Sequence, residues 1–342
     1  MARPVGPTVD VHAHFFPRDL PDLRVSAGDA RWPVLEIDGD EAKIVVDGVV
    51  TRRAGSSLWD VGARVAALDA VGVDVQVISP VPIALVPWAP IEAAMGWVES
   101  LNEGLADAVR ASSGRLAGLG AVPLGPDGSS VAAAVAEARR IRDRGLVGVE
   151  MSTLPGGREL DDPALDPFWA ALDELRLPVL VHPTDTQAVR RAGQPYEFGI
   201  GMLTDTALAG SALLFGGVLG RFPRLRIALC HGCGALPWTF HRSLFVATRQ
   251  SGIDLAVAEE LVGRLWTDTL VFDPEHLRLV TARVGVSHLM LGTDDPMVPG
   301  RLQTAETEVR EAVLRGVLPP EALADVLGGN ALRFLGFEPE RQ

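Results

Sequence analysis

The stretch Thr8-Val9-Asp10-Val11-His12-Ala13-His14, near the start of the sequence, decides how the rest of the chain is interpreted. Residues 7–12 have the pattern of a short strand, and its two histidines are two positions apart. Because successive strand side chains point to opposite faces, His12 and His14 point the same way. A metal ion that uses both imidazole lone pairs explains such a pair economically. Taken alone, the pair is equally compatible with packing or surface histidines.

Size and charge limit the classes of function. The chain has 342 residues, 47% of them hydrophobic, which is enough for one large α/β domain with insertions or for two smaller domains. With 31 Lys and Arg against 44 Asp and Glu, the net charge is −13, which disfavours nucleic acid as a partner. The sequence shows neither a leader pattern nor an uninterrupted apolar run of membrane-spanning length, so no membrane partner is expected.

The two cysteines, Cys230 and Cys233, cannot form a disulfide framework, and we therefore expect a cytoplasmic protein. Their Cys-x-x-Cys spacing is also compatible with a redox pair or a thiolate metal site. No second pair exists to complete such a site, so this interpretation is the weaker one.

Apolar runs and segments of helical period alternate along the chain. Most strand-like runs are apolar at their centres, as strands buried on both faces are. The eight predicted strands are 7–12, 74–79, 115–123, 145–151, 178–182, 226–231, 265–272 and 288–294. The predicted helices between them are 60–71, 91–111, 129–144, 163–175, 203–219, 236–249 and 274–284, followed by 302–315, 320–327 and 330–335. This alternation predicts a (β/α)₈ barrel (TIM barrel) with extra C-terminal helices.

An insertion follows the first strand, at about residues 18–58. It contains three β-rich runs separated by Asp38-Gly39 and Asp47-Gly48, and Asp-Gly between such runs is a hairpin signal. We therefore predict a small β-meander beside the barrel mouth, within a single domain that spans residues 1–342.

Polar residues recur where the predicted strands end. His182, His231 and Asp294 end the fifth, sixth and eighth strands, and His12 and His14 end the first. A barrel gathers the C-terminal ends of its strands at one rim, where its active site lies. These side chains are therefore predicted to converge on a metal, with buried hydrogen-bonded histidines as the alternative.

This constellation resembles the amidohydrolase superfamily, whose binuclear members bridge two metals through a carboxylated lysine on strand four. The single lysine of this chain, Lys43, lies in the insertion. The resemblance therefore implies a mononuclear site. Glu150, near the end of strand four, is expected to orient its neighbours or to contact substrate, with replacement of the bridging lysine as the alternative.

Longer motifs narrow the resemblance to aminocarboxymuconate-semialdehyde decarboxylase and its relatives among metal-dependent decarboxylases. The motifs are Asp47–Arg52 (DGVVTR), Leu58–Asp60 (LWD), Gly216–Pro223 (GGVLGRFP), His231–Pro237 (HGCGALP), Trp266–Asp268 (WTD), Gly292–Pro296 (GTDDP) and Gly329–Ala331 (GNA). The resemblance implies non-oxidative loss of CO₂ from a small unsaturated or aromatic carboxylic acid.

The resemblance also implies roles for individual residues. His12, His14, His182 and Asp294 would hold one divalent metal per chain, zinc or alternatively manganese. His231 would act as general acid/base beside Asp294. Arg52 would bind a substrate carboxylate, with Arg53 as the alternative if the strand register differs. Arg242 is similar to the arginine that the family lends to a neighbouring site, which implies a homodimer. Asp268 is expected to be a buried orienting group.

Several positions depart from the family pattern around the expected pocket. Thr184 replaces a tryptophan, Asp295 replaces an aromatic residue and Cys233 replaces a glycine. These departures concern the substrate more than the reaction class. Two other functions stay open: a hydrolase or hydratase that acts on a lactone, amide or enoic acid, and a non-catalytic binding barrel.

Overall fold

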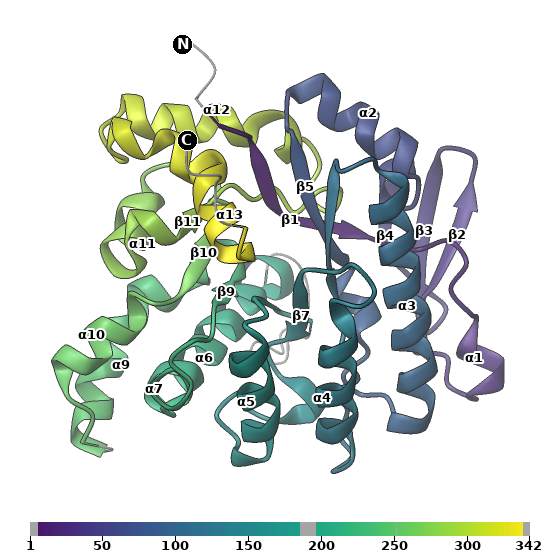
Figure 1. Ribbon diagram of the computed structural model, residues 1–342, viewed down its shortest axis with the longest axis horizontal. Coiled ribbons are helices and arrows are strands. Elements are labelled where there is room, and N and C mark those ends of the chain that lie inside the picture. Colours follow the sequence, from purple (N-terminus) through teal and green to yellow (C-terminus); the bar gives the residue numbers. More distant parts are fainter. Residues whose placement is uncertain (1–5, 185–195, 251, 338–342) are drawn as a thin grey trace.

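The computed structural model describes residues 6–184, 196–250 and 252–337. Eight parallel strands within these ranges form one sheet, in the order β1-β5-β6-β7-β8-β9-β10-β11. The strands are β1 (Val9–Phe15), β5 (Val75–Pro80), β6 (Leu116–Gly120), β7 (Gly148–Ser152), β8 (Val179–His182), β9 (Ile227–Leu229), β10 (Trp266–Asp268) and β11 (Leu289–Met290). Figure 1 shows the helices arranged around these strands, and the predicted (β/α)₈ barrel is confirmed.

The sheet closes where its last strand meets its first. Just beyond β11, the backbone N–H of Asp294 donates to the carbonyl of His12 at 2.7 Å. The N–H of His14 in turn donates to the carbonyl of Asp295, also at 2.7 Å. These bonds place Asp294 directly beside the two histidines of β1, although almost the whole chain separates them in sequence.

β1 is longer than the predicted strand 7–12, because it continues through both histidines to Phe15. Its pairing with β5 shifts register between Asp10 and Ala13, which is a β-bulge. Bulges redirect side chains and are common beside active sites. The two histidines therefore lie inside the strand, where ladder hydrogen bonds hold their backbone.

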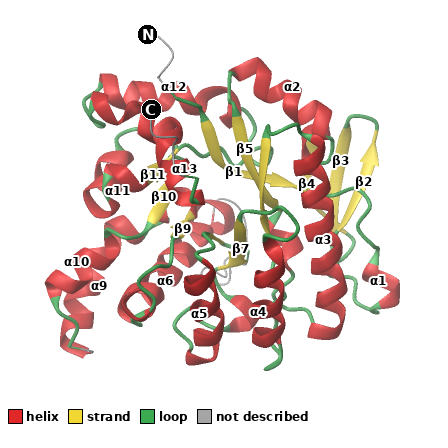
Figure 2. Ribbon diagram, in the orientation of Figure 1, coloured by secondary structure: helices red, strands yellow, loops and turns green. Residues whose placement is uncertain are grey.

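Most of the α-helices lie around the outside of the barrel, as the secondary-structure colours of Figure 2 show, whereas α8 carries His231 at the site and α13 covers one end. They are α1 (Leu23–Ser26), α2 (Val61–Val71), α3 (Ile91–Ala111), α4 (Ser130–Ile141), α5 (Asp166–Leu175), α6 (Met202–Phe215), α7 (Val218–Arg221), α8 (Cys230–Cys233), α9 (Leu236–Gln250), α10 (Leu255–Val262), α11 (His276–Val284), α12 (Arg301–Leu314) and α13 (Asn330–Leu335). Helix α10 was not predicted from the sequence. The sequence also predicted one helix over 320–327, where the structure has a 3₁₀ turn (Pro320–Ala322) followed by a π turn (Asp325–Gly329).

The barrel interior is apolar at one end and polar at the other. Val9, Val77, Leu180 and Met290 pack with Phe334 of α13, which covers the apolar end. Interior layers of branched side chains are the usual filling of such a barrel. The polar end, where the strands finish, is left open for the site.

The insertion after β1 forms a three-stranded antiparallel sheet beside the barrel (Figure 1). Its strands are β2 (Val34–Asp38), β3 (Glu41–Val46) and β4 (Val49–Gly55), as the two Asp-Gly hairpin signals predicted. In the β3–β4 ladder Ile44 pairs with Arg52 and Lys43 with Arg53. Arg52 and Arg53 therefore face opposite sides of this sheet.

Among the described helices, the segment Tyr196–Phe215 has the length and apolar composition that could cross a membrane. Buried core helices pass the same test. Here α6 packs against α8 and α9 inside the fold, which accounts for its apolar composition.

Candidate metal centre

Four buried side chains bring unpartnered donor atoms together at the polar end of the barrel. One ligand atom from each of His12, His14, His182 and Asp294 lies within 4.8 Å of the others. No hydrogen bond within the described residues satisfies Nε2 of the three histidines or Oδ1 of Asp294, although Nε2 of His14 lies 3.0 Å from Oδ1 of Asp294. Leaving four buried polar atoms unpaired is costly, so their convergence indicates a ligand at that point.

Hydrogen bonds on the far side of the rings decide which nitrogen faces the centre. Nδ1 of His14 lies 2.9 Å from the carbonyl of Pro80, and Nδ1 of His182 lies 2.9 Å from the carbonyl of Pro183. A carbonyl can only accept, so each Nδ1 carries the proton and each Nε2 presents a lone pair. Burial lowers the pKa of both imidazoles, which keeps them neutral and able to bind a metal.

His12 is oriented by a carboxylate instead of a carbonyl. Its Nδ1 donates to Oδ2 of Asp268 at 2.8 Å. Burial opposes protonation of the ring, but this hydrogen bond and the charges of Asp294 and Asp268 outweigh it. Together they raise the pKa of His12 to about 9. A carboxylate behind a histidine is the usual support of a metal ligand, since it fixes the tautomer and increases the basicity of the other nitrogen.

Asp268 also supports the backbone that carries His231. Its carboxylate accepts the N–H groups of His231 at 2.9 Å and of Gly232 at 3.1 Å. His231 has a φ of 58°, a left-handed conformation that is unfavourable for a residue with a side chain. Asp268 therefore links His12 on β1 to His231 beyond β9, in line with the predicted orienting role.

A glycine allows this approach of β10 to β1. A Cβ on Gly292 would lie 2.6 Å from Cβ of Asp268 and 3.1 Å from Cβ of His12. Any larger residue at this position would push the two side chains apart. The glycine of the GTDDP motif is thus explained by packing.

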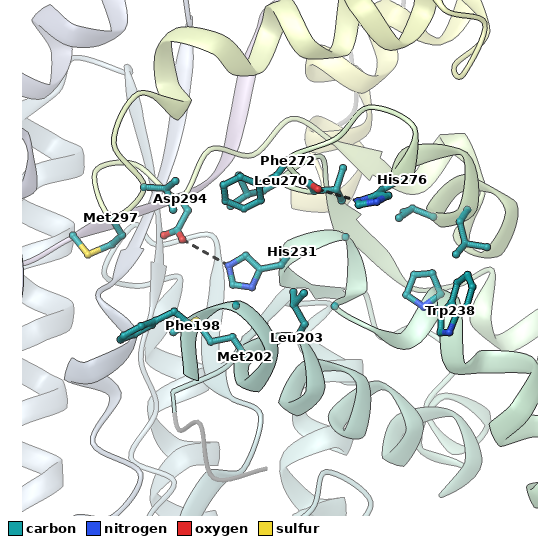
Figure 3. A pocket seen from close by; sticks show the side chains of 18 of the residues that line it. Phe198, Met202, Leu203, His231, Trp238, Leu270, Phe272, His276, Asp294 and Met297 are labelled. Carbon is teal, nitrogen blue, oxygen red and sulfur yellow. Dashed lines mark hydrogen bonds and ion pairs between the residues drawn. The ribbon is translucent and has the colours of Figure 1, made fainter. Parts of the chain in front are cut away.

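His231 lies beside the four donors and is not one of them. Its Nε2 is 3.7 Å from Oδ2 of Asp294, and its ring centroid is 5.1 Å from that of His182. The side chain faces the cavity in Figure 3, with a dashed line to Asp294. Although burial raises the pKa of Asp294, its contacts with His14 and His231 and the positive charge of His12 bring it well below its usual range. The aspartate is therefore ionised and available both to a metal and to His231.

The two arginines of β4 and the arginine of α9 are placed differently. Arg52 is half-buried, stacks at 4.1 Å over the ring of Phe198 and lines the cavity around the metal centre. Arg53 is exposed and does not line that cavity, so the register favours Arg52. Arg242 is exposed on α9 and does not reach the centre of its own chain. Its predicted role in a neighbouring subunit stays a prediction.

Glu150 lies on β7, and its side chain is fully buried inside the barrel. Neither of its carboxylate oxygens has a hydrogen-bond partner of ordinary geometry among the described residues. Burial raises the pKa of Glu150 well above its usual range, so the group is held neutral. It does not belong to the four-donor set.

A polar network behind the centre was missed by the sequence analysis. The buried guanidinium of Arg64 donates to the carbonyl of His14 at 2.6 Å and lies 3.4 Å from Asp295. The side chain of Gln76 links Arg64 to Asp10, which also accepts from Thr293. Asp295, one of the departures from the family pattern, is the partner of this buried cation. The available signal was a single arginine within a mostly apolar helical stretch.

The donor set fits a divalent metal. Three imidazoles, of which His12 must first release a proton, and one carboxylate converge on one point; this set suits zinc and equally suits manganese. The observation that carries this fit is the set of four buried atoms without partners.

The fold and the site define a class of protein. The amidohydrolase family model matches residues 9–337, so the chain belongs to the amidohydrolase family. The 2-amino-3-carboxymuconate-6-semialdehyde decarboxylase of Dictyostelium discoideum is 32% identical over 97% of this chain and 92% of its own length. A 2-keto-4-carboxy-3-hexenedioate hydratase from Sphingobium is 24% identical over 84% of this chain and 82% of its own.

Solved structures share the fold over nearly their whole length. The 5-carboxyvanillate decarboxylase of Sphingomonas paucimobilis has a TM-score of 0.78 at 24% identity, covering 97% of this chain and 99% of that one. The 5-carboxyvanillate decarboxylase of Novosphingobium aromaticivorans, complexed with manganese and a nitrobenzoic acid, has a TM-score of 0.73 at 20% identity, covering 97% and 96%. The predicted resemblance to metal-dependent decarboxylases is confirmed.

Proposed function

We propose that this protein is a metal-dependent, non-oxidative decarboxylase of a small unsaturated or aromatic carboxylic acid. The convergence of His12, His14, His182 and Asp294, with His231 and Arg52 beside them, carries the proposal. The relatives favour decarboxylation over hydrolysis, since the first of them is a decarboxylase at 32% identity. One hydratase relative keeps hydration as the competing outcome to be tested.

The chain's residues divide the work of breaking one C–C bond. When bound, the divalent ion supplies Lewis-acid polarisation of the substrate, and we propose zinc, with manganese as the alternative. Arg52 holds a carboxylate through its planar guanidinium. As CO₂ leaves, the electron pair of the broken bond stays on the carbon. His231 delivers a proton to that carbon from Nε2, and Asp294 beside it stabilises the protonated imidazole.

The test is a balance of products. Metal-loaded protein is incubated with hydroxybenzoates, a carboxyvanillate-type acid and an aminocarboxymuconate semialdehyde, and CO₂ and the remaining product are quantified. We expect one CO₂ per acid consumed, with no oxidant needed. The variant His231→Asn is expected to lose about 10²–10⁴-fold in kcat while still binding metal. Hydrated or hydrolysed products without CO₂ would refute the proposal.

We further propose a cytoplasmic homodimer in which Arg242 serves the partner's site. Its exposed position on α9 and the unpaired, buried Cys230 and Cys233 support these two statements. Arg242→Ala and Arg52→Ala should each be inactive as homodimers. Mixing them should restore about a quarter of the wild-type activity, because half of the dimers then contain one intact site. No recovery after subunit exchange would assign Arg242 to another role.

A further inference from the structure

Two cavities meet at the metal centre. One has a volume of about 800 Å³ and the other about 410 Å³. Arg52, Phe198, Asp294 and Met297 line both of them. The smaller cavity continues past His14 and His182, and the larger one continues past His231. A molecule bound at the centre therefore has two directions in which to extend.

The smaller cavity is the polar one. Thr51, Thr184 and Glu197 line it together with Arg52. Ser152 fixes the hydroxyl of Thr184 at 2.7 Å. Hydroxyl groups and a guanidinium suit the oxygen atoms of a carboxylic acid. Apart from Glu197, the polar groups on this side of the centre therefore suit an acid function.

The larger cavity has a mostly apolar wall. In Figure 3 it runs from Asp294 and Met297, past His231, to a far end between His276 and Trp238. Leu270 and Val280 are buried in its wall, and Leu279 is half-buried. Arg52 is the one permanently charged cation that lines it within the described ranges, and it lies at the metal end. Glu275 at the far end disfavours a second carboxylate there.

The size of this cavity exceeds what a single-ring acid fills. Cavities of roughly 300–1,000 Å³ hold ligands of drug size, and 800 Å³ lies near the top of that range. At its edge Phe272 is 66% exposed; Trp238, which is 83% exposed, lies one turn before Arg242 on the helix proposed to meet the partner subunit. Large aromatic side chains left in water beside an apolar cavity are typical of a surface that binds an apolar group.

We propose that the larger cavity binds an alkyl chain carried by the substrate, so that the enzyme acts on alkyl-substituted aromatic acids. This inference rests on the proposed function for its reaction and on the cavity for its specificity. The carboxylate stays with Arg52 and the metal centre. The chain passes His231 and lies against Leu270, Leu279 and Val280, where its transfer from water supplies binding energy.

Binding can be tested apart from catalysis. Metal-loaded protein is titrated calorimetrically with phenol and with 2-, 3- and 4-alkylphenols carrying one to five carbons. In at least one positional series, affinity should rise about fourfold for each added methylene. If all three series are flat, the inference is overturned.

Variants at the far end localise the effect. Leu279→Trp should abolish the gain with chain length and leave the affinity for phenol unchanged. Leu279→Ala should reduce the gain per methylene, which keeps the test valid if the larger residue prevents folding. Ala282→Trp, exposed on the same helix and outside the cavity, is the matched control and should behave as wild type. A chain-length gain that survives both Leu279 variants would overturn the placement.

A decarboxylation assay separates this inference from the proposed function. CO₂ release is compared for a hydroxybenzoic acid and its alkyl derivative, with kcat/KM expected to favour the derivative at least tenfold. Release from the simple acid alone would refute the inference and keep the function. Chain-dependent binding without CO₂ would do the opposite. If light scattering shows that Leu279→Trp splits a dimer while the phenol series are flat, the cavity belongs to an interface between two copies.

Discussion

The isosteric substitution Asp268→Asn tests whether one carboxylate organises the whole centre. In the wild type, Oδ2 accepts from Nδ1 of His12 and from the backbone of His231. Oδ1 accepts from the backbone N–H groups of Gly232 and Leu270 at 3.1 and 3.0 Å. All four partners are donors, so the site requires an acceptor on both sides.

An asparagine cannot satisfy both sides. Whichever way its amide is turned, the NH₂ group faces two donors. If NH₂ takes the place of Oδ2, His12 must turn its lone pair to Nδ1 and its proton to Nε2, which removes it from the metal site. If NH₂ takes the place of Oδ1, the loop after His231 loses both of its anchors. Hydrogen bonds to charged groups contribute about 1.5–3 kcal/mol each. Losing two such bonds therefore predicts a decrease of about 3–6 kcal/mol in the free energy of unfolding.

Two measurements separate the effects on stability and on metal binding. Urea unfolding of the metal-free protein gives the stability, and competition with a chelator gives the zinc dissociation constant. We expect zinc affinity to fall about 10–100-fold, as for other residues that support a metal ligand. Asp173→Asn is the matched control, since Asp173 is buried on α5 and accepts from Arg224 at 2.6 and 2.9 Å, away from the barrel rim. It should destabilise the protein and leave zinc affinity unchanged. Zinc affinity of Asp268→Asn within twofold of wild type would refute the reasoning.

Three further predictions follow from the same contacts. In the metal-free protein the pKa of His12 is raised to about 9, so the ring is protonated at pH 7 and must release a proton to bind metal. Calorimetry in two buffers should show about one proton released at pH 7, and metal affinity should rise about tenfold per pH unit between pH 6 and 8. A pH-independent affinity would contradict the structure. Arg64→Met leaves the Asp295 carboxylate and the His14 carbonyl without their buried partner; urea unfolding should show a loss of about 3–5 kcal/mol, whereas a loss below 1 kcal/mol would mean that the network is not needed. Burial raises the pKa of the Cys233 thiol to about 12 and that of Cys230 well above its usual range. Neither thiol should therefore react with a disulfide reagent at pH 8 until the protein is unfolded. Rapid reaction of the native protein would favour the redox interpretation of the Cys-x-x-Cys pair.

The barrel could be predicted because the hydrophobic pattern of the strands and the residue types at their ends indicated the same fold. Each parallel strand is buried on both faces and is therefore an apolar run, and a histidine or aspartate at its C-terminal end stands out against that run. The exact ends of the strands were harder to predict from the sequence. β11 has two residues where seven were predicted, because the backbone beyond Met290 pairs with β1 and the Asp325–Gly329 turn instead of continuing the ladder.

The second layer of the site illustrates what sequence patterns omit. Asp268 was recognisable as a buried carboxylate, but nothing in its own segment says that it joins His12 to the backbone of His231. Arg64 lies 50 residues from the carbonyl it binds and 231 from Asp295. Such contacts depend on how neighbouring strands stagger, and a single-residue shift in register would replace every one of them.

Residues with a left-handed backbone connect the barrel strands to this second layer of the site. His231 and Asp294 both have a φ of 58°; His231 lies shortly after β9 and Asp294 shortly after β11. Along an extended strand, successive side chains alternate between the two faces of the sheet; the left-handed backbone interrupts this alternation, and the two side chains lie 3.7 Å apart at the metal centre. Such a conformation costs of order 1–3 kcal/mol and persists where surrounding bonds enforce it. Asp268 supplies those bonds at His231, and the carbonyl of His12 supplies one at Asp294. The proposed proton donor, His231, and the proposed anionic ligand, Asp294, are thus held next to each other by β1 and by Asp268, so a change at any one of these contacts should disturb the whole site.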